Sequence, residues 1–215
     1  MNRLHRFSPL LVFCSALLAL AILGPIKCQQ LPPDIAPFAT ILFLGYGAWL
    51  LLEARITWGE GRKAVAQRDN GTLEVYAVGR LLTLLTTLAC PTRRPAAPIV
   101  LLGCLIFVGG IALRLFAIRH LGRAYSHRVR TPEPNLLVTH GVYRTLRHPA
   151  YSGMLLAHAG LVTAVPNWAA IFVLFLVFVP AVIWRIRTEE TLLFESLPGY
   201  RDYAVKRKRI IPAIW

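Results

Sequence analysis

Four long apolar runs, separated by short polar segments, fill the first half of the chain. They lie at about residues 8–26, 35–52, 75–90 and 98–118, and each is long enough to cross the hydrocarbon of a bilayer as an α-helix. The pattern therefore predicts four membrane-spanning helices in this half of the chain.

A fifth apolar region, residues 151–184, is too long for a single span and carries Pro166 and Asn167 at its middle. Because such a pair favours a turn, we expect a helical hairpin here. The predicted fold class is all-α: a polytopic transmembrane helical protein with four spans and a C-terminal hairpin. We expect residues 1–118 to form a transmembrane scaffold and residues 119–215 to carry the chemistry, within one structural domain.

The composition supports a membrane location, since 56% of the side chains are hydrophobic and only 16% are charged. The first apolar run follows a basic start, MNRLHR, as the apolar region of a signal peptide would. No small-residue cleavage site precedes the LPPD segment, and further spans follow. We therefore interpret the first run as a retained helix.

The net charge of +14 would suit a nucleic-acid-binding protein, but the distribution of the cations argues otherwise. If the N-terminus is cytoplasmic, nearly all lysines and arginines fall on the cytoplasmic side, and only Lys27, Arg93 and Arg94 fall outside. This is the positive-inside asymmetry of multi-pass proteins. We predict that both termini and the active site face the cytoplasm, that the cations contact anionic membrane lipids, and that no nucleic acid is bound.

Two arginines lie within the predicted spans, where an ionisable group either faces a polar cavity or reaches the membrane surface. We expect Arg114, about one turn from the cytoplasmic end, to extend to that surface, whereas the sequence leaves both options open for Arg80. In the fourth span, Gly103, Gly109 and Gly110 would allow a close contact with another helix.

The cysteines and histidines predict no metal site, because their spacing matches none of the known metal-binding patterns. Cys28 and Cys90 are both expected near the outer surface. The sequence leaves open whether these two residues form a disulfide.

Between the fourth span and the hairpin, the stretch GVYRTLRHPAYSG concentrates cations, tyrosines and a proline. Pro149 suits the first turn of a helix, so the hairpin is expected to begin here, with Arg147 and His148 beside its free N–H groups. Such a helix start favours a carboxylate or phosphate. Tyr143 and Tyr151 could stack on an adenine or face a sulfonium. The alternative is an interfacial belt of aromatic and basic residues with no ligand.

A second polar motif, RIRTEE, follows the hairpin and places Arg185 and Glu189 four residues apart on one helical face. One interpretation is a surface ion pair of about 0.3–0.5 kcal/mol. The other is that Glu189 receives an amino group or a ribose hydroxyl while Arg185 grips an acidic substrate, because guanidinium groups match carboxylates.

Together these motifs resemble a known family. The pattern LVTxGVYRxxRHPxYxG, some thirty apolar residues, RxxxEE and FExLPGYxxYxxxxxRxIP is similar to that of the isoprenylcysteine carboxyl methyltransferase family, integral membrane enzymes that use S-adenosylmethionine. The resemblance covers about residues 113–212. Membrane phospholipid methyltransferases share part of it, and membrane sterol reductases that use NADPH share the RHPxYxG segment.

The resemblance implies roles for individual residues. Arg185 matches the arginine placed at the substrate carboxylate, and Glu189 matches the acidic residue that holds the cofactor. The segment before the GVY motif, in which this chain has Asn135 where the family often has histidine, corresponds to the lining of the cofactor pocket. The implied cofactor-binding residues are Asn135, Leu136, Leu137, Val138, Tyr143, His148, Pro149, Ala150, Tyr151 and Glu189.

The function predicted from the resemblance is an S-adenosyl-L-methionine-dependent membrane methyltransferase that acts on a carboxylate of a lipidated or amphiphilic acceptor. The alternatives are a phospholipid N-methyltransferase, an NADPH-dependent membrane reductase, and a non-catalytic membrane protein on the same scaffold. The sequence names neither the acceptor nor the oligomeric state.

Overall fold

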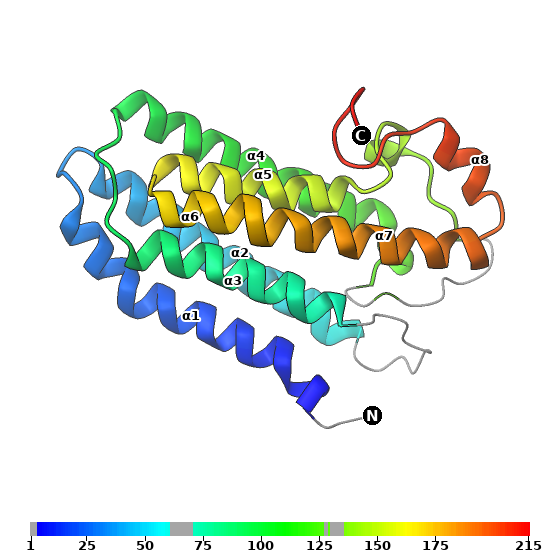
Figure 1. Ribbon diagram of the computed structural model, residues 1–215, viewed down its shortest axis with the longest axis horizontal. Helices are drawn as coiled ribbons and strands as arrows, with labels where there is room; N and C mark the ends of the chain where they lie inside the picture. Colours follow the sequence, from blue (N-terminus) through cyan, green and yellow to red (C-terminus); the bar gives the residue numbers. More distant parts are fainter. Residues whose placement is uncertain (1–3, 61–70, 127–128, 130–135) are drawn as a thin grey trace.

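The computed structural model describes residues 4–60, 71–126, 129 and 136–215, with the side chains of 4–9 and 57–60 excepted. Within these ranges every regular element is helical. The long helices run side by side as a bundle (Figure 1). They are α1 (Leu4–Gln30), α2 (Ala36–Glu60), α3 (Thr72–Ala89), α4 (Ala97–Leu121), α5 (Pro149–Ala164), α6 (Trp168–Val173) and α7 (Val179–Ser196), followed by the short α8 (Tyr200–Val205).

Five of these helical stretches are long and apolar enough to cross a membrane. The predicted fold class is confirmed, including the hairpin: α5 leads to α6, which continues into α7 through a π-helical turn, Leu174–Phe178. Pro149 is the first residue of α5, as expected. Asn167 ends the turn of the hairpin by accepting a hydrogen bond from the Ala170 N–H at 2.8 Å, which caps α6.

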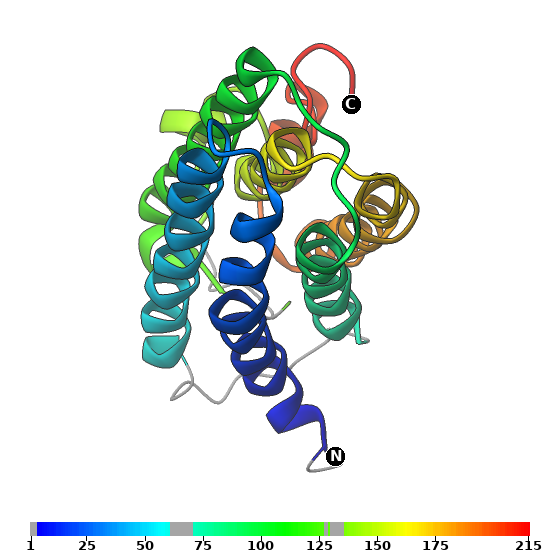
Figure 2. The ribbon, with the colours of Figure 1, turned by 90° about the vertical axis from the view of Figure 1, so that its left-hand side faces the viewer.

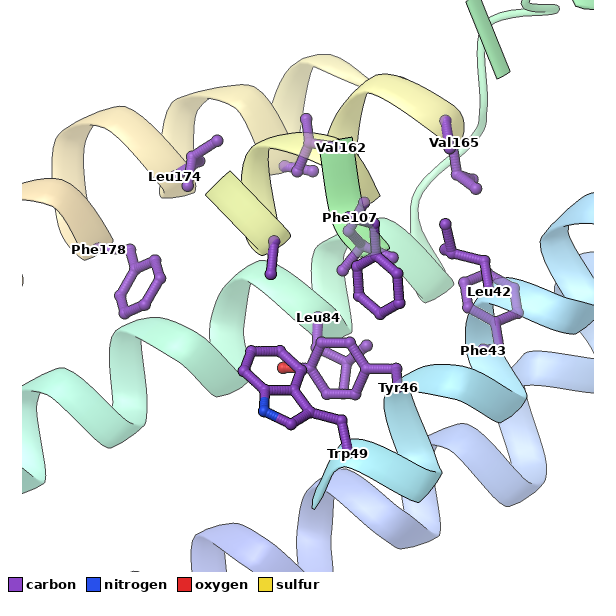
Figure 3. Close-up of a cluster of buried hydrophobic side chains, with 14 of the residues drawn as sticks. Leu42, Phe43, Tyr46, Trp49, Leu84, Phe107, Val162, Val165, Leu174 and Phe178 are labelled. Atoms are coloured by element: carbon purple, nitrogen blue, oxygen red, sulfur yellow. The ribbon is translucent and has the colours of Figure 1, made fainter. Parts of the chain in front are cut away.

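Side chains from all seven long helices, α1 to α7, and from the π-helical turn contribute to the apolar core, part of which is drawn in Figure 3. Tyr46 and Trp49 of α2 meet Phe107 of α4, and the rings of Tyr46 and Phe107 stack with centroids 6.1 Å apart. Leu84 of α3, Val162 of α5 and Phe178 of the π-helical turn belong to the same cluster. The outward side chains of the bundle, by contrast, are large, apolar and exposed, as expected for helices surrounded by lipid.

The tightest contact in the bundle joins α4 to α5 through glycines. A Cβ atom at Gly110 would overlap the backbone of Ala157, and one at Gly103 would overlap that of Ala164. Without side chains at these positions, the two backbones touch. Gly109 differs from its neighbour Gly110, because a Cβ there would meet nothing within 4 Å. The prediction of a close helix contact is therefore confirmed for Gly103 and Gly110, and wrong for Gly109.

The four cysteines are free thiols, which answers the question left open about Cys28 and Cys90. The Cys90 carbonyl instead accepts a hydrogen bond from the Lys27 ammonium at 2.5 Å, and Thr92 Oγ1 accepts a second at 3.0 Å. This contact ties the end of α1 to the end of α3.

Gly110→Val should weaken the fold, because the new side chain would be driven into the backbone of α5. Overpacking of this kind costs about 1–3 kcal/mol, and more where the obstacle is backbone. The measurement is the thermal unfolding midpoint of the detergent-purified protein. Gly109→Val, one residue away on the open side of α4, is the matched control and should change the midpoint little. Equal effects of the two variants would contradict the contact.

Candidate active site

A cavity of about 150 Å³ lies at one end of the bundle, where α3, α4, α5, α7 and α8 converge. In Figure 1 this is the end that carries α8 and the C-terminus. Figure 2 shows the bundle from the opposite end, with the helices arranged beside one another. Six of the seven tyrosines of the chain line the cavity: Tyr76, Tyr125, Tyr143, Tyr151, Tyr200 and Tyr203.

Most of the residues expected from the sequence meet at this cavity. Its walls include Leu136, Leu137, Val138, Tyr143, His148, Ala150, Tyr151, Arg185 and Glu189. Pro149 is buried in the first turn of α5 and does not line the cavity. Asn135 lies outside the described residues.

Arg185 and Glu189 meet through the hydroxyl of Tyr151. The Arg185 Nε donates to this hydroxyl at 2.9 Å, and the hydroxyl donates to Glu189 Oε2 at 2.8 Å. A second guanidinium nitrogen of Arg185 donates to Thr72 Oγ1 at 3.1 Å. Since Arg185 is only 3% exposed, the pair is not the surface ion pair considered as an alternative. The arrangement places a fixed guanidinium and a carboxylate on the cavity wall.

The neighbouring glutamate, Glu190, points elsewhere and is buried between two arginines and a histidine. Its Oε1 lies 2.9 Å from Arg147 Nη1 and 3.2 Å from His148 Nε2, and its Oε2 lies 2.7 Å from Arg209 Nε. Glu190 therefore joins the start of α5 to α7 and to the C-terminal tail. Sequence reasoning missed this residue, although the RxxxEE motif contains it.

The start of α5 is also held by the backbone of the tail. The Arg147 N–H donates to the Lys208 carbonyl at 2.8 Å, and the His148 N–H donates to the Arg209 carbonyl at 2.9 Å. The side chains of Arg147 and His148 already face Glu190. The backbone N–H groups of Arg147 and His148, and one nitrogen of each side chain, are thus engaged within the protein. Binding of a ligand carboxylate at the start of α5 itself stays a prediction.

Arg114 of α4, which is 4% exposed, also lines the cavity. Its Nε is ion-paired to Glu53, one Nη donates to the Ala150 carbonyl at 3.2 Å, and the other lies 3.5 Å from the Tyr125 hydroxyl. Glu53 also pairs with Arg80, at 2.7 Å. The expectation that Arg114 reaches the membrane surface is wrong, because a buried carboxylate on α2 binds it.

Several tyrosines of the cavity were not assigned from the sequence. The buried hydroxyls of Tyr76 and Tyr200 have no hydrogen-bond partner among the described residues, so each can contact a ligand. Tyr203 donates to the carbonyls of Tyr143 at 2.7 Å and Leu146 at 3.2 Å, and burial raises the pKa of Tyr203 to about 12. Burial also raises the pKa of Tyr143 and of Tyr200. These hydroxyls stay protonated at neutral pH.

The sequence patterns that could have identified these residues differ from one residue to another. Tyr200 and Tyr203 stand in the LPGYxxY segment, and Tyr125 in LGRAYS, so the motifs contained them. Tyr76 and Arg114 come from apolar helices of the first 118 residues, where no motif marked them. Helices α3 and α4 thus contribute to the cavity as well as to the scaffold.

Comparisons with known proteins point to the same region of the chain. The model of the isoprenylcysteine carboxyl methyltransferase family matches residues 101–195. A probable protein-S-isoprenylcysteine O-methyltransferase of Oryza sativa subsp. indica is 27% identical over 184 residues, covering 78% of this chain and 96% of that protein. The protein-S-isoprenylcysteine O-methyltransferase of Saccharomyces cerevisiae is 33% identical over 116 residues, covering 53% of this chain and 48% of the yeast protein.

The fold is also similar to a solved structure. The eukaryotic intramembrane Ras methyltransferase, an isoprenylcysteine carboxyl methyltransferase, aligns with a TM-score of 0.51 at 20% identity. The alignment covers all of this chain and 88% of the other. At this level of identity the likeness concerns the fold.

Glu53→Gln should strongly destabilise the protein, because it leaves Arg80 and Arg114 buried without their counter-charge. Removing one partner of a buried ion pair costs about 3–5 kcal/mol. The thermal unfolding midpoint of the purified protein tests this expectation. Asp34→Asn, which neutralises an exposed carboxylate, is the control. An unchanged midpoint for Glu53→Gln would show that the buried charges do not stabilise the bundle.

Proposed function

From the resemblance to the isoprenylcysteine carboxyl methyltransferase family, which is confirmed, we propose that this chain is an integral membrane methyltransferase that uses S-adenosyl-L-methionine. The observation that carries the proposal is that two motifs far apart in the sequence meet at one cavity. Tyr151 of the first motif contacts both Arg185 and Glu189 of the second. We further propose that this end of the bundle faces the cytoplasm, because most of the cations lie in its loops and helix ends.

The cavity suits the polar and aromatic parts of this methyl donor. Bound S-adenosylmethionine would supply a methyl group on a sulfonium. Glu189 provides a carboxylate for an amino group or a ribose hydroxyl, and Tyr143 and Tyr151 provide aromatic faces for the adenine or the cation. Leu136, Leu137 and Val138 provide an apolar wall.

For the acceptor, we propose a carboxylate on an isoprenylcysteine-like or other amphiphilic lipid. The buried guanidinium of Arg185 would align this group. A carboxylate is already anionic at neutral pH, so its oxygen would attack the methyl carbon in line without a general base; the carbon–sulfur bond would break as the carbon–oxygen bond forms, and the neutral thioether would leave. The role of the protein is then to orient the reactants and exclude water.

The product distinguishes the proposed acceptor from the alternatives. The chain, reconstituted with labelled S-adenosylmethionine and a prenylcysteine acceptor, should form a methyl ester that alkali hydrolyses to labelled methanol. An alkali-stable product on a phospholipid amine would identify an N-methyltransferase instead. Failure to bind S-adenosylmethionine would favour the reductase or the non-catalytic alternative.

Glu189→Gln should weaken S-adenosylmethionine binding about 10- to 100-fold, because it removes a charge-assisted hydrogen bond of about 1.5–3 kcal/mol. Arg185→Ala should instead lower acceptor turnover while cofactor affinity changes less. Equilibrium binding and methyl-transfer kinetics measure the two effects. Glu195→Gln and Arg187→Ala, on the same helix but away from the cavity lining, are the matched controls. Normal binding and turnover in both site variants would refute the assigned roles.

The apolar chain of the acceptor should matter for turnover but little for cofactor affinity. Leaving the bilayer would cost the acceptor roughly 0.8 kcal/mol per methylene, so we expect its tail to reach the cavity laterally between helices while the cofactor enters from water. A prenylated acceptor and a short-chain analogue are compared in the reconstituted protein. The analogue should show a much higher Michaelis constant. Equal efficiency of the two acceptors would mean that the membrane serves only as an anchor.

A further inference from the structure

A second concavity lies beside the active-site cavity and has a different character. It is lined by residues 204–209, Ile214 and Trp215 of the C-terminal segment, together with Arg147. Residues 206–209 are four consecutive cations, Lys-Arg-Lys-Arg, so the groove combines five positive side chains with an aromatic ring. The methyl-transfer proposal uses none of these features.

Two of the arginines that line this groove carry a buried donor without an acceptor in the part of the chain that the structure describes; one of them, Arg147, also lines the active-site cavity. The Nε atoms of Arg147 and Arg207 are shielded from water and have no hydrogen-bond partner among the described residues. The Nη1 of Arg147 is held by Glu190, while a terminal nitrogen of Arg207 donates to the Lys206 carbonyl at 2.9 Å. Because an unsatisfied buried donor is costly, the groove is suited to an oxyanion that could accept from both guanidinium groups.

Exposed apolar side chains adjoin the same segment. Val205 is 87% exposed and Ile214 is 73% exposed, and Ile211 is exposed as well. A polybasic segment with protruding apolar side chains, close to the ends of membrane spans, is typical of a surface that meets anionic lipid. A soluble anion would satisfy the arginines but would leave these apolar side chains in water.

We propose that this groove, the tail groove, binds the phosphodiester headgroup of an anionic phospholipid, with Val205, Ile211 and Ile214 directed to the acyl region. The bound headgroup would hold the tail against the start of α5, where the carbonyls of Lys208 and Arg209 accept from the backbone N–H groups of Arg147 and His148. The proposal concerns lipid binding and stands whether or not the chain transfers methyl groups.

The test is direct binding of phosphatidylglycerol to the purified protein in zwitterionic detergent, measured by native mass spectrometry or by titration. Lys206→Gln combined with Lys208→Gln removes two exposed charges that are not part of the active-site cavity. At about 1 kcal/mol per cation near an anionic surface, the double variant should bind about thirtyfold more weakly. Phosphatidylcholine should bind neither protein detectably.

The matched control is the pair Arg55→Gln and Arg119→Gln, which removes two exposed cations near the same end of the bundle. Its phosphatidylglycerol affinity should stay within twofold of the wild type. Equal losses in the two double variants would show a general effect of charge and overturn the site. Inorganic phosphate that competes as well as the lipid would overturn the assignment to a lipid headgroup. S-adenosylmethionine binding, measured on the same samples, reports separately on the proposed function and on folding.

Discussion

The segments around the cavity are joined by one buried carboxylate. Glu190 lies within ion-pair distance of Arg147, His148 and Arg209, which come from the start of α5 and from the C-terminal tail. An isolated buried carboxylate would be strongly unfavourable, and several charged partners are needed to offset the lost hydration. Glu190 therefore joins α7 to the start of α5 and to the C-terminal tail, three segments that lie around the cavity.

A second buried carboxylate organises the other side of the cavity. Glu53 binds Arg80 and Arg114, and Arg114 in turn reaches the Ala150 carbonyl at the start of α5. The polar contacts continue deeper, where the Tyr46 hydroxyl lies 3.2 Å from Arg80 Nε and 2.9 Å from His158 Nε2. In hydrocarbon such groups must satisfy one another, so the network fixes how α2, α3, α4 and α5 are rotated. The N-terminal helices thus set the geometry of a site whose motifs lie mostly in the C-terminal half.

The helices were predictable because hydropathy and Pro149 act locally. Most of the residues predicted for the site do line the cavity, because they stand in contiguous motifs, but the greater part of the lining comes from residues that were not predicted. The orientation of the Arg114 side chain was not predictable, because it is set by an ion pair with Glu53 of α2, which lies 61 residues away in the sequence. The two adjacent glutamates differ for a similar reason. Successive residues on a helix point about 100° apart, and only packing against α5 and the tail decides that Glu189 faces the cavity while Glu190 is enclosed. The backbone bonds between the tail and α5 also join distant segments, which no local pattern reveals.

The π-helical turn at Leu174–Phe178 has a consequence for the whole of α7. Such a turn takes up one residue more than an α-helical turn, so every residue after it is displaced by about 100° around the axis relative to an uninterrupted helix. Arg185 and Glu189 lie beyond this turn, and their orientation toward Tyr151 includes that offset. The length of an apolar segment that does not line the cavity therefore helps to set which side chains face the cavity. One residue more or fewer between Trp168 and Arg185 would rotate Arg185 and Glu189 away from Tyr151, even if the composition and hydropathy of the span stayed the same.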